Sequence, residues 1–311
     1  MRLVLSLVVF VSIVGCGAHS SRAFLGDAAA PAPSRIPVDD AELLRVQARA
    51  RYIVEAERAA IRATDVLMES KDVDLSPSRM QMHLTLPHGG AWYGLFGRVD
   101  DAGKFIPAYA LKAPHEEPEW MELIPVNTLP IDFSPMARAV KRAKNITVET
   151  FGRPSVNPVV LVEASGDITV YTLQGTRDPK RFFYGGDFRF RFAPDGKTLR
   201  EQVKLHPSVI AVDVAPITED ASRMDAHLHQ TFKGPLETEL ALLMLYPELT
   251  SLAVGHVDTA VTYVLFPDGG ISVVTEDNPA SRRDLLPDGT FALPPTAPKP
   301  PEAEAPETGA P

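Results

Sequence analysis

The ten residues 187–196, DFRFRFAPDG, decide the class of fold that this sequence predicts. Phe188, Phe190 and Phe192 alternate with charged residues, so the three rings project from one face of a strand and the charges from the other. The turn sequence Pro-Asp-Gly follows, in which proline fixes one backbone dihedral and glycine accepts a positive φ. The stretch therefore predicts a half-buried strand that ends in a tight turn.

Other parts of the chain repeat this pattern. Pro-Asp-Gly recurs at residues 267–269 and 287–289, and the first copy lies between the apolar runs 263–266 and 271–274. Further strand-like runs occupy residues 92–99, 159–163, 168–173 and 209–214. Many short strands joined by tight turns predict a mainly antiparallel meander sheet.

Three segments instead have helical features. Residues 40–69 contain no Gly or Pro, begin with acids and place apolar residues at helical spacing, which predicts one long amphipathic helix with Glu57 on its solvated face. A shorter helix is expected from Ser134 to about Asn145, and another from Pro235, with Glu237 and Glu239 in its first turn. The expected fold class is α+β, with the long helix packed on the sheet; a coiled coil with a partner is the alternative for that helix.

Composition limits the possible functions of the 311-residue chain. It is 45% apolar, which supports a folded core of one domain or two over residues 39–276. Asp and Glu number 40 against 31 Lys and Arg, which argues against nucleic acid as a partner. The small, proline-bearing residues 16–38 predict a flexible tether, and the proline-rich acidic residues 277–311 predict a disordered tail.

The amino terminus has the features of a targeting signal. Met1-Arg2 precedes an apolar run over residues 3–14, which predicts a signal peptide over residues 1–15. The run ends in the sequence IVGC at residues 13–16, which contains the only cysteine and resembles the bacterial lipobox. A buried structural cysteine after an ordinary signal peptide is the alternative.

The lipobox resemblance implies that Cys16 is the lipid attachment site. In such lipoproteins the thiol is alkylated with diacylglycerol, the signal is cut before the cysteine, and the new amino terminus is acylated. The chain is therefore expected to be a membrane-anchored lipoprotein of the bacterial cell envelope. Gly17, where Asp usually directs retention in the inner membrane, favours the outer membrane.

The core loosely resembles a group of uncharacterised bacterial proteins. The matching stretches are VYTL at 170–173, GGDFRF at 185–190, Asp195-Gly196, PLE at 235–237 and TYVL at 262–265. The chain departs from the group at residues 205–208, which read LHPS where the group often carries Ser-x-Ser-Cys. The resemblance implies a fold but no activity.

One set of residues has the chemistry of a metal site. Asp225, His227 and His229 share one face of an expected strand, and His256 and Asp258 would join them if they lay on the neighbouring strand. Imidazoles and carboxylates in this arrangement suit a zinc ion. The alternative is a solvated strand face, because Thr231 and Lys233 continue it; His206 is expected to be structural or exposed.

The sequence contains no Gly-x-Ser-x-Gly elbow, phosphate-binding glycine loop or His-Glu-x-x-His motif. The expected function is therefore a lipid-anchored, non-catalytic binding or scaffolding module without a cofactor, which contacts the membrane through Cys16 and has an envelope protein or polymer as its expected partner. The alternative is a metal-dependent envelope hydrolase that uses the His/Asp set with zinc.

The lipid anchor is tested by Cys16→Ser, which removes the only thiol that can be acylated. We expect the wild-type chain in the membrane fraction of a bacterial host and the variant outside it, measured by fractionation and immunoblotting, because stable membrane attachment requires the acyl chains. Ser20→Ala is the matched control and should stay with the membranes. Membrane retention of Cys16→Ser would show that the anchor was misidentified.

Overall fold

The phenylalanine-rich stretch forms strand β8 (Phe188–Phe192) in a computed structural model that describes residues 36–71, 73–176, 178, 180–213, 224–275 and 282–292. Phe188, Phe190 and Phe192 are 2%, 0% and 0% exposed, as the alternation predicts. The strand pairs on both sides, in the four-stranded antiparallel sheet β5-β6-β8-β9. The described residues form an α+β fold with mostly antiparallel sheets and, within those ranges, three α-helices.

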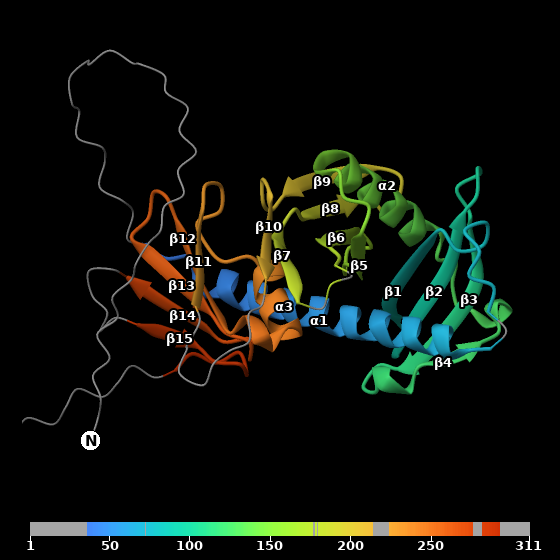
Figure 1. The fold of residues 1–311 in the computed structure, drawn as a ribbon, viewed down its shortest axis with the longest axis horizontal. Helices are drawn as coiled ribbons and strands as arrows, with labels where there is room; N and C mark the ends of the chain where they lie inside the picture. The colour runs from blue at the N-terminus through green and yellow to red at the C-terminus, as the bar shows by residue number, and fades with distance from the viewer. Residues whose placement is uncertain are drawn as a thin grey trace, which may run out of the picture. The chain divides into compact units, whose positions relative to one another are not determined.

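The elements follow one another along the chain as shown in Figure 1. The helices are α1 (Asp40–Glu69), α2 (Ser134–Phe151) and α3 (Glu237–Leu245), with single 3-10 turns at Pro118–Trp120, Val126–Thr128 and Pro247–Leu249. The remaining strands in the first half are β1 (Met82–His88), β2 (Ala91–Val99), β3 (Phe105–Pro114), β4 (Glu122–Ile124), β5 (Val156–Val162) and β6 (Ile168–Gln174). Those in the second half are β7 (Arg181–Gly185), β9 (Leu199–Lys204), β10 (Val209–Asp213), β11 (Met224–His229), β12 (Ser251–His256), β13 (Val261–Leu265), β14 (Ile271–Thr275) and β15 (Arg283–Leu285).

The strands form four sheets among the described residues, whereas the sequence predicted one meander. The order β1-β2-β3-β4 is a meander, β7 pairs with β10, and the fourth sheet has the order β11-β12-β13-β14-β15. One pair breaks the antiparallel rule, because β11 and β12 run parallel. Parallel neighbours need a long crossover, and α3 provides it. That crossover places the start of α3 near the end of β11.

Helix α1 is the longest element and packs on several others. Asp39 caps it by accepting a hydrogen bond from the backbone N–H of Glu42 at 2.8 Å. Leu43, Val46 and Ile53 are fully buried in a cluster that also contains residues of α3, β2 and β12–β14. The prediction that Glu57 lies on a solvated face is wrong. Glu57 is only 7% exposed, and its carboxylate accepts a hydrogen bond from the side chain of Asn157 at 3.2 Å.

Two predicted boundaries also differ. Helix α2 continues six residues beyond Asn145, because Thr147 is buried and its hydroxyl bonds Ala143 O and the hydroxyl of Thr172; Gly152, at φ 67°, then ends the helix. The predicted disordered tail begins too early, since β15 pairs with β14 and buries Leu285 within residues 282–292. The signal peptide, Cys16, most of the tether and the rest of the tail lie outside the described residues.

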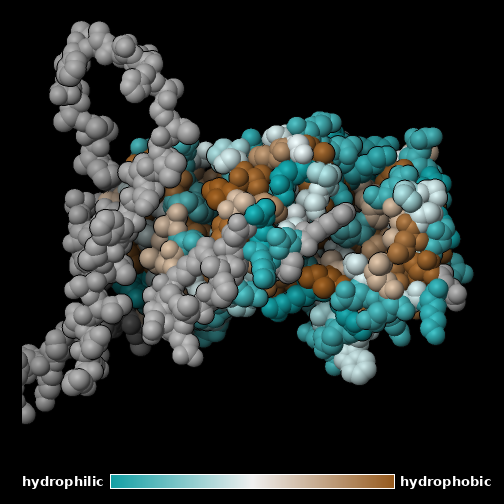
Figure 2. Space-filling view, in the orientation of Figure 1, coloured by the Kyte–Doolittle hydropathy of each residue, from teal (hydrophilic) through white to brown (hydrophobic). Residues whose placement is uncertain are grey.

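On the face drawn in Figure 2, hydrophobic residues form separate patches between hydrophilic ones. Among the described residues no helix is both long and apolar enough to cross a membrane.

The turn of residues 194–196 has a steric requirement that the other Pro-Asp-Gly turns lack. Gly196 and Gly289 both have positive φ, 67° and 85°, but only at Gly196 would a Cβ collide with backbone, the carbonyl of Pro135. We expect Gly289→Ala to cost about 1–2 kcal/mol from the backbone conformation alone. Gly196→Ala should cost at least about 2 kcal/mol more, because the start of α2 must move. Urea unfolding measures both, and equal losses would contradict the close approach.

Glu57 gives the fold a defined pH dependence. Burial raises its pKa to about 7 from 4.5, while the hydrogen bond from Asn157 lowers it. The folded state therefore holds the proton more tightly than the unfolded state, and stability falls as pH rises from about 4.5 to 7. We expect Glu57→Gln to stabilise the protein by up to about 3 kcal/mol at pH 8 and by little at pH 4.5.

Urea unfolding at several pH values measures this difference. The exposed neighbour Glu55 is the matched control, and Glu55→Gln should change stability by less than about 0.5 kcal/mol at every pH. A gain from Glu57→Gln that is independent of pH would show that Glu57 is not the titrating group.

Candidate metal centre

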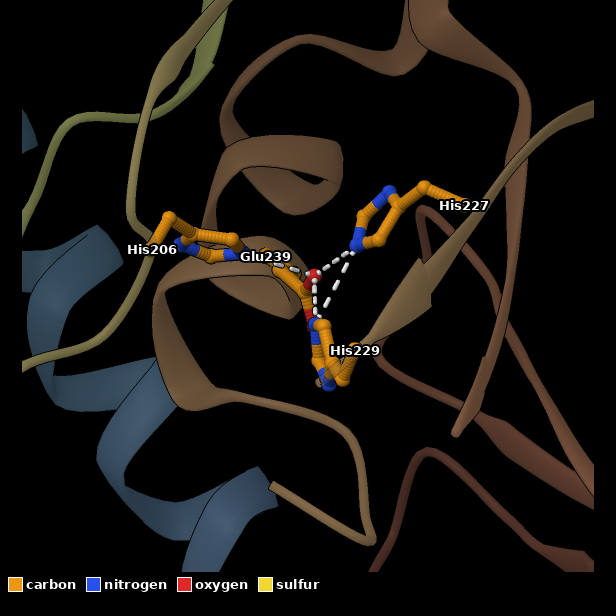
Figure 3. A group of neighbouring side chains, drawn as sticks. All are labelled: His206, His227, His229 and Glu239. Carbon is orange, nitrogen blue, oxygen red and sulfur yellow. Dashed lines mark hydrogen bonds and ion pairs between the residues drawn. The ribbon is translucent and has the colours of Figure 1, made fainter. Parts of the chain in front are cut away.

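Four side chains from three separate segments converge in the core. They are His206 from the loop after β9, His227 and His229 from β11, and Glu239 from α3 (Figure 3). One ligand atom from each residue lies within 4.8 Å of all the others. The group therefore has the size of a single metal coordination sphere.

Strand β11 and helix α3 position three of these residues. His227 and His229 are two positions apart in a strand, so their side chains project to the same face. Glu239 is the third residue of α3, and its Oε2 accepts a hydrogen bond from the backbone N–H of Leu236 at 2.9 Å. That bond anchors one carboxylate oxygen at the helix start and leaves Oε1 directed at the imidazoles.

The three imidazoles surround the Oε1 atom of Glu239. Nε2 of His227, His229 and His206 lies 2.5, 2.9 and 3.1 Å from it, respectively. The Nε2 atoms of His227 and His229 are 3.2 Å apart. Side-chain exposure is 1% for Glu239, 5% for His229, 6% for His206 and 16% for His227, so water reaches the centre mainly beside His227.

Two adjacent glycines bring His206 to this site. Gly185 and Gly186 have φ of 72° and 67°, which L side chains rarely adopt. A Cβ at Gly185 would lie 2.8 Å from the Cβ of His206 and 2.5 Å from the carbonyl oxygen of Ser208. The glycines thus let the loop that carries His206 pack directly on the chain ahead of β8, where Asp187 lies.

A second layer of polar groups orients two of the imidazoles. Nδ1 of His206 lies 2.6 Å from Oδ1 of Asp187, whose Oδ2 accepts a hydrogen bond from the Thr238 hydroxyl at 2.5 Å. Nδ1 of His229 lies 3.2 Å from the carbonyl oxygen of Gly234. Carbonyl and carboxylate oxygens only accept, so both Nδ1 atoms donate, and in a neutral ring Nε2 then keeps a lone pair. Metal-binding histidines are oriented in this way.

Charge balance explains why these groups tolerate burial. Burial alone would raise the pKa of Glu239, but hydrogen bonds from His206, His227 and His229 hold it well below its ordinary value. Burial alone would lower the pKa of His206. The carboxylates of Asp187 and Glu239 have a larger, opposite effect and raise that pKa to about 10. The buried carboxylate thus requires positive charge beside it, which either protons or a cation can supply.

Three of the separations between ligand atoms are close to those of a tetrahedral zinc site. Zinc-to-nitrogen bonds of about 2.0–2.1 Å place the ligand atoms of a tetrahedron about 3.3 Å apart. The separations of 2.9, 3.1 and 3.2 Å lie close to that edge, and the 2.5 Å contact of His227 would have to lengthen by about 0.8 Å. His206, His227, His229 and Glu239 are therefore a group that could hold one metal ion.

Only part of the predicted metal set belongs to this centre. His227 and His229 do, but Asp225, His256 and Asp258 are not among the converging residues. Strand β12 does lie beside β11, with His256 paired to His229 in the register. However, Nε2 of His256 bonds the carbonyl oxygen of Gln230 at 3.2 Å, and its Nδ1 accepts the backbone N–H of Asp258 at 3.0 Å.

His206 and Glu239 were missed as site residues. His206 was expected to be structural or exposed, and it is 5% exposed within the centre. Glu239 was recognised only as an acid at a helix start. The sequence of α3 does contain a signal for the burial of Glu239. Leu240, Ala241 and Leu243 leave this short helix without a polar face, so the acids in its first turn must be buried and need polar partners.

The neighbouring acid Glu237 has a separate set of partners. Its Oε1 accepts bonds from the Tyr171 hydroxyl at 2.9 Å and from Arg189 at 2.8 Å, and Arg45 lies 3.5 Å away. Burial would raise the pKa of Glu237, but Arg189 and Arg45 lower it below its ordinary value. Glu237 therefore stays an ion-paired structural group outside the centre.

Comparison of the chain with protein-family models, with curated proteins and with solved structures finds no match.

Proposed function

We propose that this protein is a lipid-anchored binding protein of the bacterial cell envelope that holds a divalent transition metal ion, zinc above all, through His206, His227, His229 and Glu239. The observation that carries the proposal is the convergence of three Nε2 atoms on one buried carboxylate oxygen, at 2.5–3.1 Å. Two of these rings also donate from Nδ1 to oxygen acceptors, as metal ligands do.

The donor set favours zinc and its neighbours in the first transition row. Three imidazoles with one carboxylate suit zinc, copper, iron and nickel, whereas calcium and magnesium prefer oxygen ligands alone. Zinc has no geometric preference from its d electrons, so it accepts the observed spacings with the least rearrangement. The formal charge inside the centre also supports a cation, because the carboxylate of Glu239 is buried among the three imidazoles.

Binding is favoured over hydrolysis by the composition of the adjoining pocket. A metal-dependent hydrolase needs a general base near the metal-bound water. Glu239 is here a ligand, and Asp187 is engaged by His206 and Thr238. Among the described residues, those that line the pocket beside the three imidazoles include no Asp or Glu. The hydrolase therefore remains the second candidate.

The envelope location rests on the sequence of residues 1–17. A tether over residues 16–38 would join the lipid at Cys16 to the folded residues, and Val38 is already attached to them: its N–H donates to the Tyr263 hydroxyl at 2.9 Å. Such an anchor would hold the metal centre outside the cytoplasm, where an envelope protein or polymer could reach it.

Metal binding is tested by comparing variants of the four converging residues with a variant of His256, which only the sequence predicted to be a ligand. We expect the wild-type protein, freed of metal with a chelator, to bind one zinc ion in titration calorimetry. His229→Ala and Glu239→Gln should weaken binding by at least about 100-fold, since loss of an outer-layer partner alone costs about 10–100-fold. Asp187→Ala, which removes such a partner, should fall in that lower range.

His256→Ala is the matched control. His256 is as buried as His229 and pairs with it across the two strands, but its ring makes other bonds. This variant should keep its zinc with affinity within a few fold of wild type. Circular dichroism of each variant separates lost ligands from lost folding. The proposal would be contradicted by a folded wild-type protein that binds no zinc, or by a folded His229→Ala variant that binds zinc with wild-type affinity.

A further inference from the structure

A pocket opens directly beside the three imidazoles. His206, His227 and His229 all line it, whereas Glu239 does not. It has a volume of about 270 Å³, and its wall comes from the loop after β9, from β10, from β11 and from the segment after β11. An ion held by the four ligands would therefore be reached through this pocket, to which α3 contributes no lining residue.

The wall of this pocket is apolar or neutral. Leu205, Ile210 and Phe232 give it apolar surface, and Ser208 and Thr231 give it hydroxyl groups. Apart from the three histidines, no titratable side chain lines it among the described residues. Ile210 is 43% exposed, so the apolar wall extends to the surface and solvent can enter. A ligand with a charged body would lose hydration here without a partner, while an apolar body would gain contact.

The charge at the ion determines which chemical group of a ligand would bind to the ion itself. A divalent cation with neutral imidazoles and the single carboxylate of Glu239 keeps one net positive charge in its first coordination sphere. Asp187 lies behind the ring of His206, is already hydrogen-bonded to it and to Thr238, and does not line the pocket. One anionic oxygen from outside would neutralise the first coordination sphere as a fifth ligand, a coordination number to which zinc expands in some sites.

We infer that the metal centre binds a small organic monoanion, a carboxylate attached to an apolar group, with its oxygen on the ion and its apolar body in this pocket. The inference rests on the proposed function, because the ion supplies the positive charge. It assigns the centre the role of a metal-dependent receptor for such anions.

The test uses cobalt(II) in place of zinc, because the visible spectrum of cobalt reports both its presence and its coordination number. The full folded chain is loaded with cobalt and titrated with benzoate, and in parallel with acetate. We expect benzoate to change the spectrum saturably toward higher coordination, and to bind at least about tenfold more tightly than acetate, since its ring adds buried apolar area. Equal affinities would overturn the apolar part of the inference.

Ile210→Trp places a larger side chain in the pocket wall at a residue that is not a ligand, and should weaken benzoate binding at least tenfold without loss of cobalt. Val162→Trp is the matched control, because Val162 is a strand residue of similar exposure, 44%, that does not line the pocket. Unchanged benzoate affinity in Ile210→Trp would overturn the assignment of the pocket.

The two proposals fail in different ways. If the wild-type protein gives no cobalt spectrum, the metal centre itself is refuted. If it gives a four-coordinate cobalt spectrum that neither benzoate nor acetate alters, the metal centre stands and only the receptor role is refuted.

Discussion

The requirement to compensate two buried carboxylates at the start of α3 organises the second half of this protein. Glu237 and Glu239 are 0% and 2% exposed, and neither could stay ionised in an apolar interior without partners. Glu237 draws Arg189 of β8 and Arg45 of α1 to one side, and Glu239 draws the three histidines to the other. Because these partners come from α1, two sheets and a loop, the helix start is where the main segments meet.

The two glutamates differ in the kind of positive charge they receive. Arginine keeps its charge at all ordinary pH values, so the pairs of Glu237 are permanent and structural. Imidazole can be neutral, and then it offers a lone pair to a metal ion. The same helix end therefore joins the ion pairs of Glu237 to the histidine cluster of Glu239 only two residues away, and the ion pairs of Glu237 hold α3 in place whatever charge the histidines carry.

Sequence patterns predicted the local features of this fold better than its long-range ones. The alternation at Phe188–Phe192 and the uninterrupted run of α1 depend on neighbours in the chain, and both elements formed where expected. Glu57 was misplaced because a helical periodicity marks a face but does not say how wide the covered face is. The parallel pairing of β11 with β12 was not predicted, since it depends on how α3 packs. His227 and His229 can be identified together from the sequence because they are neighbours in one strand. The position of His206 instead depends on a long-range contact, the close approach that Gly185 and Gly186 permit.

The crossover from β11 through α3 has a consequence for the order in which the centre can assemble. His227, His229 and Glu239 lie within residues 227–239, so an ion bridging them closes a short loop and fixes little chain. Loop-closure entropy grows with the logarithm of loop length, so this tridentate segment can engage a cation before the distant His206 arrives. A cation captured there would hold the strand against the helix start while the rest of the crossover packs, and the arrival of His206 would then join that unit to the phenylalanine-rich sheet.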